Sequence, residues 1–337
     1  MRIHFLVSVS GRVVSKNFLP VLLAVSITKG TDKTADTARF DLDDGAGSIR
    51  FPKTGERVHV ELGIQGGAVR TFDGEVDTAS WSLNRAGGSV LSVTARSVSL
   101  QGKEKAPRER HWESKPLNTI LDDAGREAGI AMQVHSAFAG VVPEYEAQDG
   151  ESFLAFGERL AREHGAIFRI AGKRGVFVPY NSSASGGALS TITVSRGLNL
   201  ISASGFEPTT DRPRIREQVH TFYDLDEARR LSERYSTGDT VDAGDTKAFS
   251  APDKSTASRR AKADGERANR DKASGTVVIN GAPSAQPGGK AILTNVRPGV
   301  DGTYTISSVT DELSRAAGYT TSLSLGEPQG SAGADDR

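Results

Sequence analysis

Apolar and polar residues alternate along much of the first hundred positions, as expected for strands with one buried face. The alternation is strict in Val58–Leu62 and Ser89–Ala95. Turn-forming residues separate such runs, for example at Asp43–Gly45 and Gly66–Gly67. The pattern predicts six strands: Ile3–Val9, Leu22–Lys29, Thr37–Asp41, Arg57–Leu62, Ala68–Asp77 and Val90–Ala95. Strands at this spacing favour a barrel or a sandwich.

The pattern changes to a helical period in the middle of the chain. Ser152 is a suitable N-cap for a helix, and Gly165 stands where a glycine commonly ends one. Two short strands follow, Ile167–Ile170 and Val176–Pro179. Between the caps, one helical face carries Phe153, Gly157, Leu160, Ala161 and His164.

A second helix is predicted just before this one. Ser114 is its expected N-cap, Pro116 lies in its first turn and Gly129 ends it. A strand, Met132–His135, follows. We expect the two helices to pack together, with Leu154, Leu160 and Ala161 buried against Leu117, Ile120 and Leu121.

Strand patterns return in the last part of the chain, after a Ser- and Gly-rich loop at 181–189. Residues 224–236 fit either a helix or a hairpin, and the choice stays open. An amphipathic helix with a thin apolar stripe is predicted near 254–273. The predicted strands are Thr191–Ser195, Leu198–Phe206, Ile215–Tyr223, Thr276–Ile279, Lys290–Thr294, Gly302–Thr310 and Gly318–Leu325.

These changes in pattern suggest a division of the 337 residues into domains. Residues 1–100 form a first β domain and 101–186 an α/β domain. Residues 187–328 form a second β domain that includes the helix near 254–273, and 329–337 form a disordered tail. The boundaries of the second β domain are the least defined by the pattern.

The amino-acid composition argues against several classes of function. The 42 basic and 42 acidic residues give a net charge of zero, so there is no global electrostatic case for binding nucleic acid or an anionic membrane. The chain has no cysteine, which excludes disulfides, thiolate metal sites and a cysteine nucleophile. The N-terminal apolar run is short and fits a strand better than a signal peptide, and no run approaches ~18 apolar residues.

Candidate catalytic residues do not form a convincing set. Glu151, Glu158, Glu163 and His164 lie on or beside the central helix, but their spacing favours a solvated helix face over a glycosidase or metal site. The residues around Ser152 only half resemble a nucleophile elbow, because Leu154 stands where the second glycine is required. Residues 45–50 resemble the start of a dinucleotide-binding loop, but the third glycine of that motif is missing. The six histidines are scattered. We therefore nominate no catalytic, cofactor-binding or metal-binding residue.

Two basic clusters are candidates for contacts with nucleic acid. In the helix near 254–273, basic and acidic residues are mixed, as on a solvated face with ion pairs. Arg212, Arg214 and Arg216 alternate and so point one way, toward either a DNA-conducting channel or an intersubunit salt bridge. The mixed helix contains Arg259, Arg260, Lys262, Asp264, Glu266, Arg267, Arg270, Asp271 and Lys272.

Four markers in chain order resemble one known family. They are Phe72–Val76; Trp112 with Ser114 and Leu117–Leu121; Gln148 with Glu151–Leu154 and Leu160–Gly165; and Ala285–Gly289 with Gly302–Ser314 and Gly318–Thr321. In this order the chain resembles the late control gene D protein family, the baseplate hub of contractile-tailed phages. That family is similar to the N-terminal hub region of the VgrG spike of type VI secretion. The resemblance covers about residues 3 to 325.

The resemblance implies a mainly β fold in which two small β-barrels flank an α/β insertion. It implies a homotrimeric ring whose six barrels give a pseudo-sixfold surface for the tail tube, with a threefold face for the trimeric spike. The implied role is structural and not enzymatic, without a cofactor. The implied partners are the chain itself, the tail tube protein, the spike protein and other baseplate proteins, with DNA passing through the central channel without specific binding. The implied location is the virion baseplate, assembled in the bacterial host cytoplasm.

Two other functions are alternatives. A tail-associated cell-wall hydrolase would need a convincing acid pair and a segment left over for a lytic domain. A truncated type VI secretion spike subunit would need the long repetitive β-helix of such spikes, which this sequence does not contain. Neither the host nor the type of particle follows from the sequence.

Overall fold

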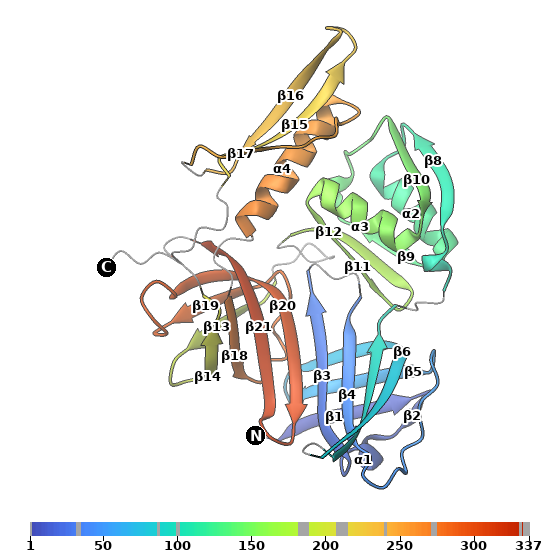
Figure 1. Ribbon diagram of the computed structural model, residues 1–337, viewed down its shortest axis with the longest axis vertical. Helices are drawn as coiled ribbons and strands as arrows, with labels where there is room; N and C mark the ends of the chain where they lie inside the picture. The colour runs from blue at the N-terminus through green and yellow to red at the C-terminus, as the bar shows by residue number, and fades with distance from the viewer. Residues whose placement is uncertain are drawn as a thin grey trace.

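The computed structural model is dominated by strands. The N-terminal strands, in blue, and the C-terminal strands, in red, lie in the lower half of Figure 1, with most of the helical structure above them. It describes residues 2–31, 35–85, 88–98, 102–180, 189–206, 215–238, 241–270, 275–329 and 332. No helix in these ranges has both the length and the apolar character needed to cross a bilayer.

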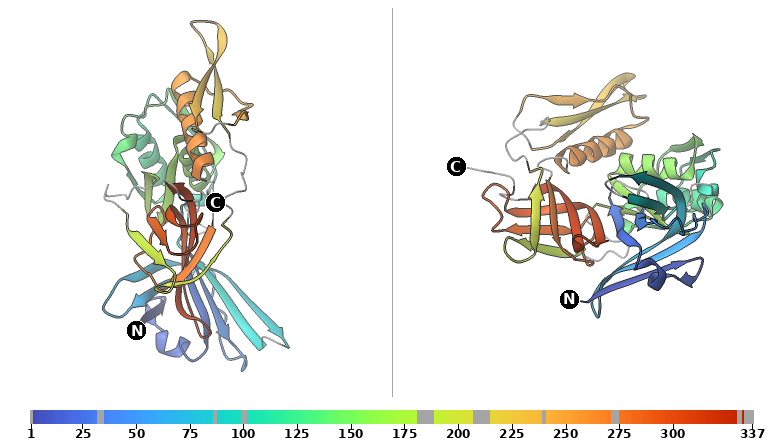
Figure 2. Two further views of the ribbon diagram at one scale, coloured as in Figure 1. Left: turned by 90° about the vertical axis from the view of Figure 1, so that its left-hand side faces the viewer. Right: turned by 60° about the horizontal axis from the view of Figure 1, so that its bottom comes forward.

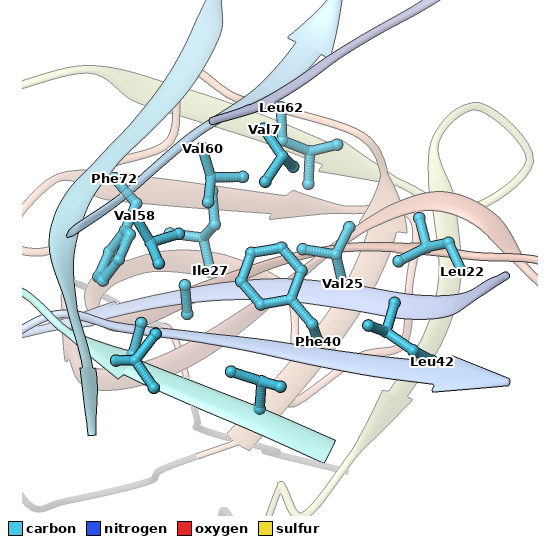
Figure 3. Close-up of a cluster of buried hydrophobic side chains, with 14 of the residues drawn as sticks. Val7, Leu22, Val25, Ile27, Phe40, Leu42, Val58, Val60, Leu62 and Phe72 are labelled. Atoms are coloured by element: carbon cyan, nitrogen blue, oxygen red, sulfur yellow. The ribbon is translucent and has the colours of Figure 1, made fainter. Parts of the chain in front are cut away.

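The first β unit consists of antiparallel strands in the order β3-β4-β7-β6-β5-β1-β2. Alternate residues point inward, so that Val25, Phe40 and Val60 meet in one apolar core (Figure 3). The elements are β1 (Ile3–Val9), β2 (Arg12–Val13), α1 (Ser15–Phe18), β3 (Leu22–Gly30), β4 (Thr37–Asp43), β5 (Arg57–Ile64), β6 (Val69–Asn84) and β7 (Gly88–Arg96). All six predicted strands are confirmed, although β6 continues well past Asp77.

The α/β unit contains two helices, a three-stranded sheet in the order β11-β12-β9 and a separate β8–β10 pair. Its elements are η1 (Lys103–Lys105), β8 (Arg108–Glu113), α2 (Leu117–Ala128), β9 (Ala131–Val134), η2 (Ser136–Phe138), β10 (Tyr145–Glu151), α3 (Phe153–His164), β11 (Ala166–Ala171) and β12 (Arg174–Pro179). The sequence did not predict β8 or β10, because charged residues interrupt both. Leu160 and Ala161 are buried in one core with α2 as expected, whereas Leu154 is only partly buried.

The predicted helix caps are confirmed in α3 and partly wrong in α2. Ser152 Oγ accepts a hydrogen bond from the backbone N–H of Ala155 at 3.2 Å, and Gly165 ends α3 in the left-handed conformation. Gly129 ends α2 in the same way. The N-cap of α2 is Pro116, which has no side chain able to cap, and not Ser114. Proline fits this position because its own backbone has no donor to satisfy.

The second β unit has the strand order β14-β18-β21-β20, with β19 on the other side of β20 and β13 beside β19. Val277, Tyr304, Ile306 and Leu323 are central to its core. The strands are β13 (Thr191–Ser195), β14 (Leu200–Ser204), β18 (Gly275–Asn280), β19 (Lys290–Thr294), β20 (Gly302–Ser314) and β21 (Gly318–Gln329).

A hairpin and a long helix project from the second β unit at the end of the molecule opposite the N-terminal strands (Figures 1 and 2). The elements are β15 (Glu217–Asp224), β16 (Arg229–Ser236), β17 (Gly244–Thr246) and α4 (Lys254–Arg270). The open choice at 224–236 is settled in favour of a hairpin, in which Glu217 pairs with Ser236 and Asp224 with Arg229. The hairpin forms because α4 covers it, with Phe222, Leu231 and Ala257 in a small apolar cluster.

Within the described ranges, strand pairing does not close either β unit into a barrel of its own, which differs from the two separate barrels expected. Among the described residues, β3 does not close onto β1. Its free edge pairs instead with β20, so both units belong to one thirteen-stranded sheet. The division into domains at 100, 186 and 328 stays a prediction.

Some sequence predictions lie outside the described residues. These include most of the loop at 181–189, Arg212 and Arg214, and most of the tail. Within the predicted tail, Gln329 is the last residue of β21, and Ala332 is buried.

Candidate functional site

The pairing of β3 with β20 joins the two β units. The pairs run in antiparallel register from Gly30 with Ser308 to Ala24 with Ser314. The first part of β20 pairs on the same side with β19, up to Thr305 with Lys290. One long strand is therefore shared by two units, and the backbone hydrogen bonds of β20 set how the units lie relative to each other.

A buried ion pair strengthens this junction. Arg70 Nε on β6 lies 2.5 Å from Asp311 Oδ2 on β20, and the side chains are 6% and 0% exposed. Arg70 Nη2 also donates to the carbonyl of Ala285. The other oxygen of Asp311 accepts from Thr321 Oγ1 at 2.6 Å and from Tyr319 Oη at 3.1 Å. Nearly every polar atom of the pair thus has a partner, which a buried charge requires.

The environment of this network keeps Tyr319 neutral. Burial raises the pKa of the Tyr319 hydroxyl, and the negative charge of Asp311 raises it further. The hydroxyl therefore stays a donor to the carboxylate. Such a network allows one arrangement of the two units, because any shift leaves a buried charge without a partner.

A second junction joins the first β unit to the α/β unit. Asp36 contacts Lys29 Nζ at 3.4 Å and also binds Arg169 on β11. Ser97 Oγ donates to the carbonyl of Ile170 at 3.0 Å and accepts from the backbone N–H of Asp36 at 2.9 Å. Burial lowers the pKa of Lys29 although Asp36 opposes this effect.

A third junction lies between the α/β unit and α4. Arg159 on α3 donates through Nε to Glu151 at 2.8 Å and through Nη1 to Glu146 at 2.9 Å. Glu163 bridges the helices, with Oε1 3.5 Å from Arg159 Nη1 and 2.9 Å from Arg260 Nη2. These side chains are half-buried between β10, α3 and α4, with exposures of 12% to 27%.

This third junction corrects the expectation of a solvated helix face. Glu163 pairs with Arg260 of α4, and His164 lies close enough to α4 for the charges of its arginines to act on it. Glu151 pairs with Arg159 on α3, and Glu158 is exposed. The expectation for α4 is likewise only partly right. Lys262 is exposed and lies 3.8 Å from Glu266, whereas Arg260 is held by Glu163 and Asp264 is bonded to His220 at 2.9 Å. The sequence could not show this because the partners come from distant segments.

The other residues considered for chemistry have structural roles. Ser152 caps α3, and the 45–50 segment forms a turn in which Asp44 Oδ1 accepts from the backbone N–H of Ile49 at 3.0 Å. No group of three or more metal-ligating side chains is found within the described ranges. The three junctions fix the orientations of the units relative to one another, and this property is mechanical.

A model of the phage tail baseplate hub family (GPD) matches residues 38–316, most of the chain. The chain belongs to this family. The resemblance inferred from the four sequence markers is confirmed. Both Arg70 and Asp311 lie inside the matched region, so the buried ion pair is part of the hub-family portion of the chain.

A curated relative gives the same result. The probable baseplate hub protein of Escherichia phage 186 is 24% identical over 195 residues, which cover 57% of this chain and 49% of that protein. The match thus spans about half the length of this hub relative.

Solved structures share the fold of this hub-family chain. The tail protein from Neisseria meningitidis MC58 has a TM-score of 0.73 at 16% identity, with 97% of each chain covered. The E. coli c3393 protein, a component of the type VI secretion system, has a TM-score of 0.57 at 14% identity. That match covers 98% of this chain and 79% of the other. At these identities the likeness concerns the fold alone.

Sequence reasoning missed Arg70 and Asp311, although a signal was present. Arg70 lies two residues before the inward-facing Phe72, and Asp311 lies two residues after the inward-facing Val309. Because side chains alternate along a strand, both charges occupy inward positions. Opposite charges at inward positions of two strands indicate a buried pair.

Proposed function

We propose that this chain is the structural hub of a phage tail baseplate, working as a homotrimeric ring that joins the tail tube to the spike. The observation that carries the proposal is the family match together with the single sheet that holds two β units in a fixed relation. Three chains with two such units each present six units around a threefold axis. A ring of this kind can meet a sixfold tube on one face and a threefold spike on the other.

The unpaired edge of strand β14 offers a surface through which neighbouring chains could join into the ring. Among the described strands, β14 pairs only with β18, and its outer edge is unpaired. Residues Ile201–Ser204 are exposed, Ile201 by 54%, and the nearby Leu198 is exposed by 76%. An apolar strand with a free edge readily pairs with another chain. We therefore place the contact between neighbouring copies at β14.

The proposal includes no catalytic step. The charged residues at the three junctions are paired with one another and hold the units together. The role that we propose for the chain is mechanical and geometric. The proposed partners are two further copies, the tail tube protein, the spike protein and other baseplate proteins. DNA would pass through the central channel without specific binding. The proposed location is the virion baseplate, after assembly in the bacterial host cytoplasm.

The test is the mass of the purified protein in solution by native mass spectrometry, alone and with the spike protein added. We expect a species of three times the 35.7 kDa chain mass. Ile201→Asp should shift the population to monomer, while the conservative Ile201→Val should keep the trimer. A folded monomer at micromolar concentration that stays single with spike present would refute the ring.

A further inference from the structure

The two β units repeat one pattern of strand pairing. In chain order, β3, β4, β6 and β7 of the first unit correspond to β14, β18, β20 and β21 of the second. Within their sheet, the first set has the order β6-β7-β4-β3 and the second set has the order β20-β21-β18-β14. All six contacts within the two sets are antiparallel. Each set therefore runs from a long hairpin to the earliest of its four strands.

The correspondence holds residue by residue in the two long hairpins. A constant step of 230 positions, for example from Leu83 to Leu313, converts every β6–β7 pair into a β20–β21 pair. The same step converts the bulge of β6 into a bulge of β20. Register and bulges are set separately in each hairpin, so agreement at every pair indicates one repeated structural unit. The matching end pairs are Glu75–Arg96 and Asn84–Gly88 in the first unit, and Thr305–Gly326 and Ser314–Gly318 in the second.

The earliest strands of the two sets correspond in the same way. β3 reaches its long hairpin through β4, and β14 reaches the other hairpin through β18, along matching rows of paired residues. Ala203 of β14 therefore occupies the place of Val25 in β3, and Ser204 occupies the place of Ser26. The two rows are Val25, Phe40, Val93 and Ala79 in the first unit, and Ala203, Val277, Leu323 and Val309 in the second.

The contact between β3 and β20 has no counterpart at the other ends of the two sets. The outer edge of β20 pairs with β3, so that Leu313 lies opposite Val25 and Glu312 opposite Ser26. In the equivalent part of β6, Thr78–Leu83 pairs with β7 alone among the described strands. Within the same ranges β14, the equivalent of β3, pairs with β18 alone. β14 and β6 lie at opposite sides of the strand region in Figure 1. The chain therefore carries both halves of a second contact of this kind without bringing them together.

Neither free edge is protected in the usual way. Charged side chains commonly keep an exposed strand edge from pairing with another chain. Thr78–Leu83 and Leu200–Ser204 contain no charged residue, whereas β16, the outer strand of the hairpin sheet, contains three arginines and a glutamate. Leu83 is 66% exposed, although its counterpart Leu313 at the internal contact is packed against the core. The two edges are thus suited to being covered by pairing.

We propose that β14 of one copy pairs with the outer edge of β6 in the next copy, in the register that β3 and β20 adopt within the chain. The pairing rests on the trimeric ring proposed above and identifies the surface that receives β14. In this register Leu83 lies opposite Ala203 of the neighbouring copy, and Ser82 lies opposite Ser204. Three such contacts join three sheets end to end and cover every free β14 edge, which closes the ring.

Disulfide cross-linking tests the pairing, because the chain has no cysteine of its own. One variant carries Leu83→Cys with Ala203→Cys, and another carries Ser82→Cys with Ser204→Cys. All four positions are exposed, so the substitutions should not disturb folding. Directly opposite residues on antiparallel strands lie about 4.5–5.5 Å apart at Cα, within the range of about 4.4–6.8 Å for a disulfide. After mild oxidation, a non-reducing denaturing gel should show covalent trimers of the 35.7 kDa chain from at least one variant, since the geometry of adjacent pairs alternates.

Leu83→Cys with Ser204→Cys is the matched control. It has the same number of thiols, but an offset of one residue places them on opposite faces of the sheet, so it should form no covalent trimer. Native mass spectrometry before oxidation separates this pairing from the ring itself. A trimer that neither matched variant cross-links would overturn the pairing and leave the ring in place, whereas a monomer with spike protein present would refute both. Cross-linking of the control to the same extent would also overturn the pairing.

A substitution tests the same edge without thiols. Leu83→Asp places a charge on the pairing edge, which opposes pairing, and should shift the population from trimer to monomer at micromolar concentration. Phe249→Asp is the matched control, because Phe249 is 87% exposed in the segment between β17 and α4, outside both edges. This variant should stay trimeric. Equal fractions of trimer in the two variants would contradict the pairing.

Discussion

At the residue scale, the Arg70–Asp311 pair decides how the β units of this hub meet. Asp311→Asn removes the negative charge and leaves the Arg70 guanidinium buried without a counter-charge. We expect a loss of about 3–5 kcal/mol in the free energy of unfolding, measured by urea titration.

The control for this prediction is an exposed ion pair. Asp123→Asn breaks the Asp123–Arg126 pair on α2, whose side chains are 40% and 76% exposed, and should cost at most about 1 kcal/mol. The double substitution Arg70→Met with Asp311→Leu should recover much of the loss, because it removes both charges. Equal losses in Asp311→Asn and Asp123→Asn would show that the buried pair does not hold the junction.

His164 makes stability depend on pH. Its pKa is about 4 in the folded chain, against the ordinary histidine value of 6.5 in an unfolded chain, so the unfolded state binds more protons between these values. Stability is therefore fully present above pH 6.5 and declines by roughly 3 kcal/mol as the pH falls toward 4. His164→Gln should remove this part of the slope in urea unfolding curves. An unchanged slope in the variant would contradict the assignment.

At the scale of elements, α2 and α3 form one packed core with the strands beside them. Leu160 is fully buried there, whereas Leu154 is only partly buried. Gly157 allows the close approach of α3 to β11, because a Cβ at this position would lie 2.4 Å from the Phe168 ring. The face of α3 is thus shaped for contact at close range.

We expect Leu160→Ala to cost roughly 2–5 kcal/mol in the free energy of unfolding, from lost apolar burial and the cavity left behind. Leu154→Ala on the same helix is the matched control and should cost clearly less, because its side chain is partly exposed already. Chemical denaturation of both variants compares them directly. Similar costs would mean that the helix does not pack as described.

At the scale of the whole molecule, the shared sheet should couple the stabilities of the two β units. Ile306 is fully buried in the second unit. We expect Ile306→Ala to speed amide exchange in β4 of the first unit as well, measured by hydrogen-exchange mass spectrometry, because the units share β20 and β3.

Phe222→Ala is the control for this coupling. Phe222 is 2% exposed, but it lies in the sheet of β15, β16 and β17, which is separate from the shared sheet. Its effect on exchange should stay within the hairpin and α4. Should Ile306→Ala change exchange only in the second unit, the two units unfold independently.

Local patterns alone determined most elements of this protein. Alternation set the strands of the first β unit, and Ser152 and Gly165 marked the ends of α3, because these signals depend on neighbours in the chain. The order of four short markers was enough to indicate the family. Strands with charged residues, such as β8, were missed because alternation of apolar residues is their usual signal.

Tertiary structure decided what depends on distant partners. The hairpin at 217–236 forms because α4 covers it, and local helix-forming residues were overruled. The union of two expected barrels in one sheet depends on strands β3 and β20, which lie near opposite ends of the sequence. The buried charges of Arg70 and Asp311 and the half-buried charge of Arg159 are tolerated only because folding brings opposite charges to them. Pairing energy of this kind is set by distance in space, which the order of residues does not specify.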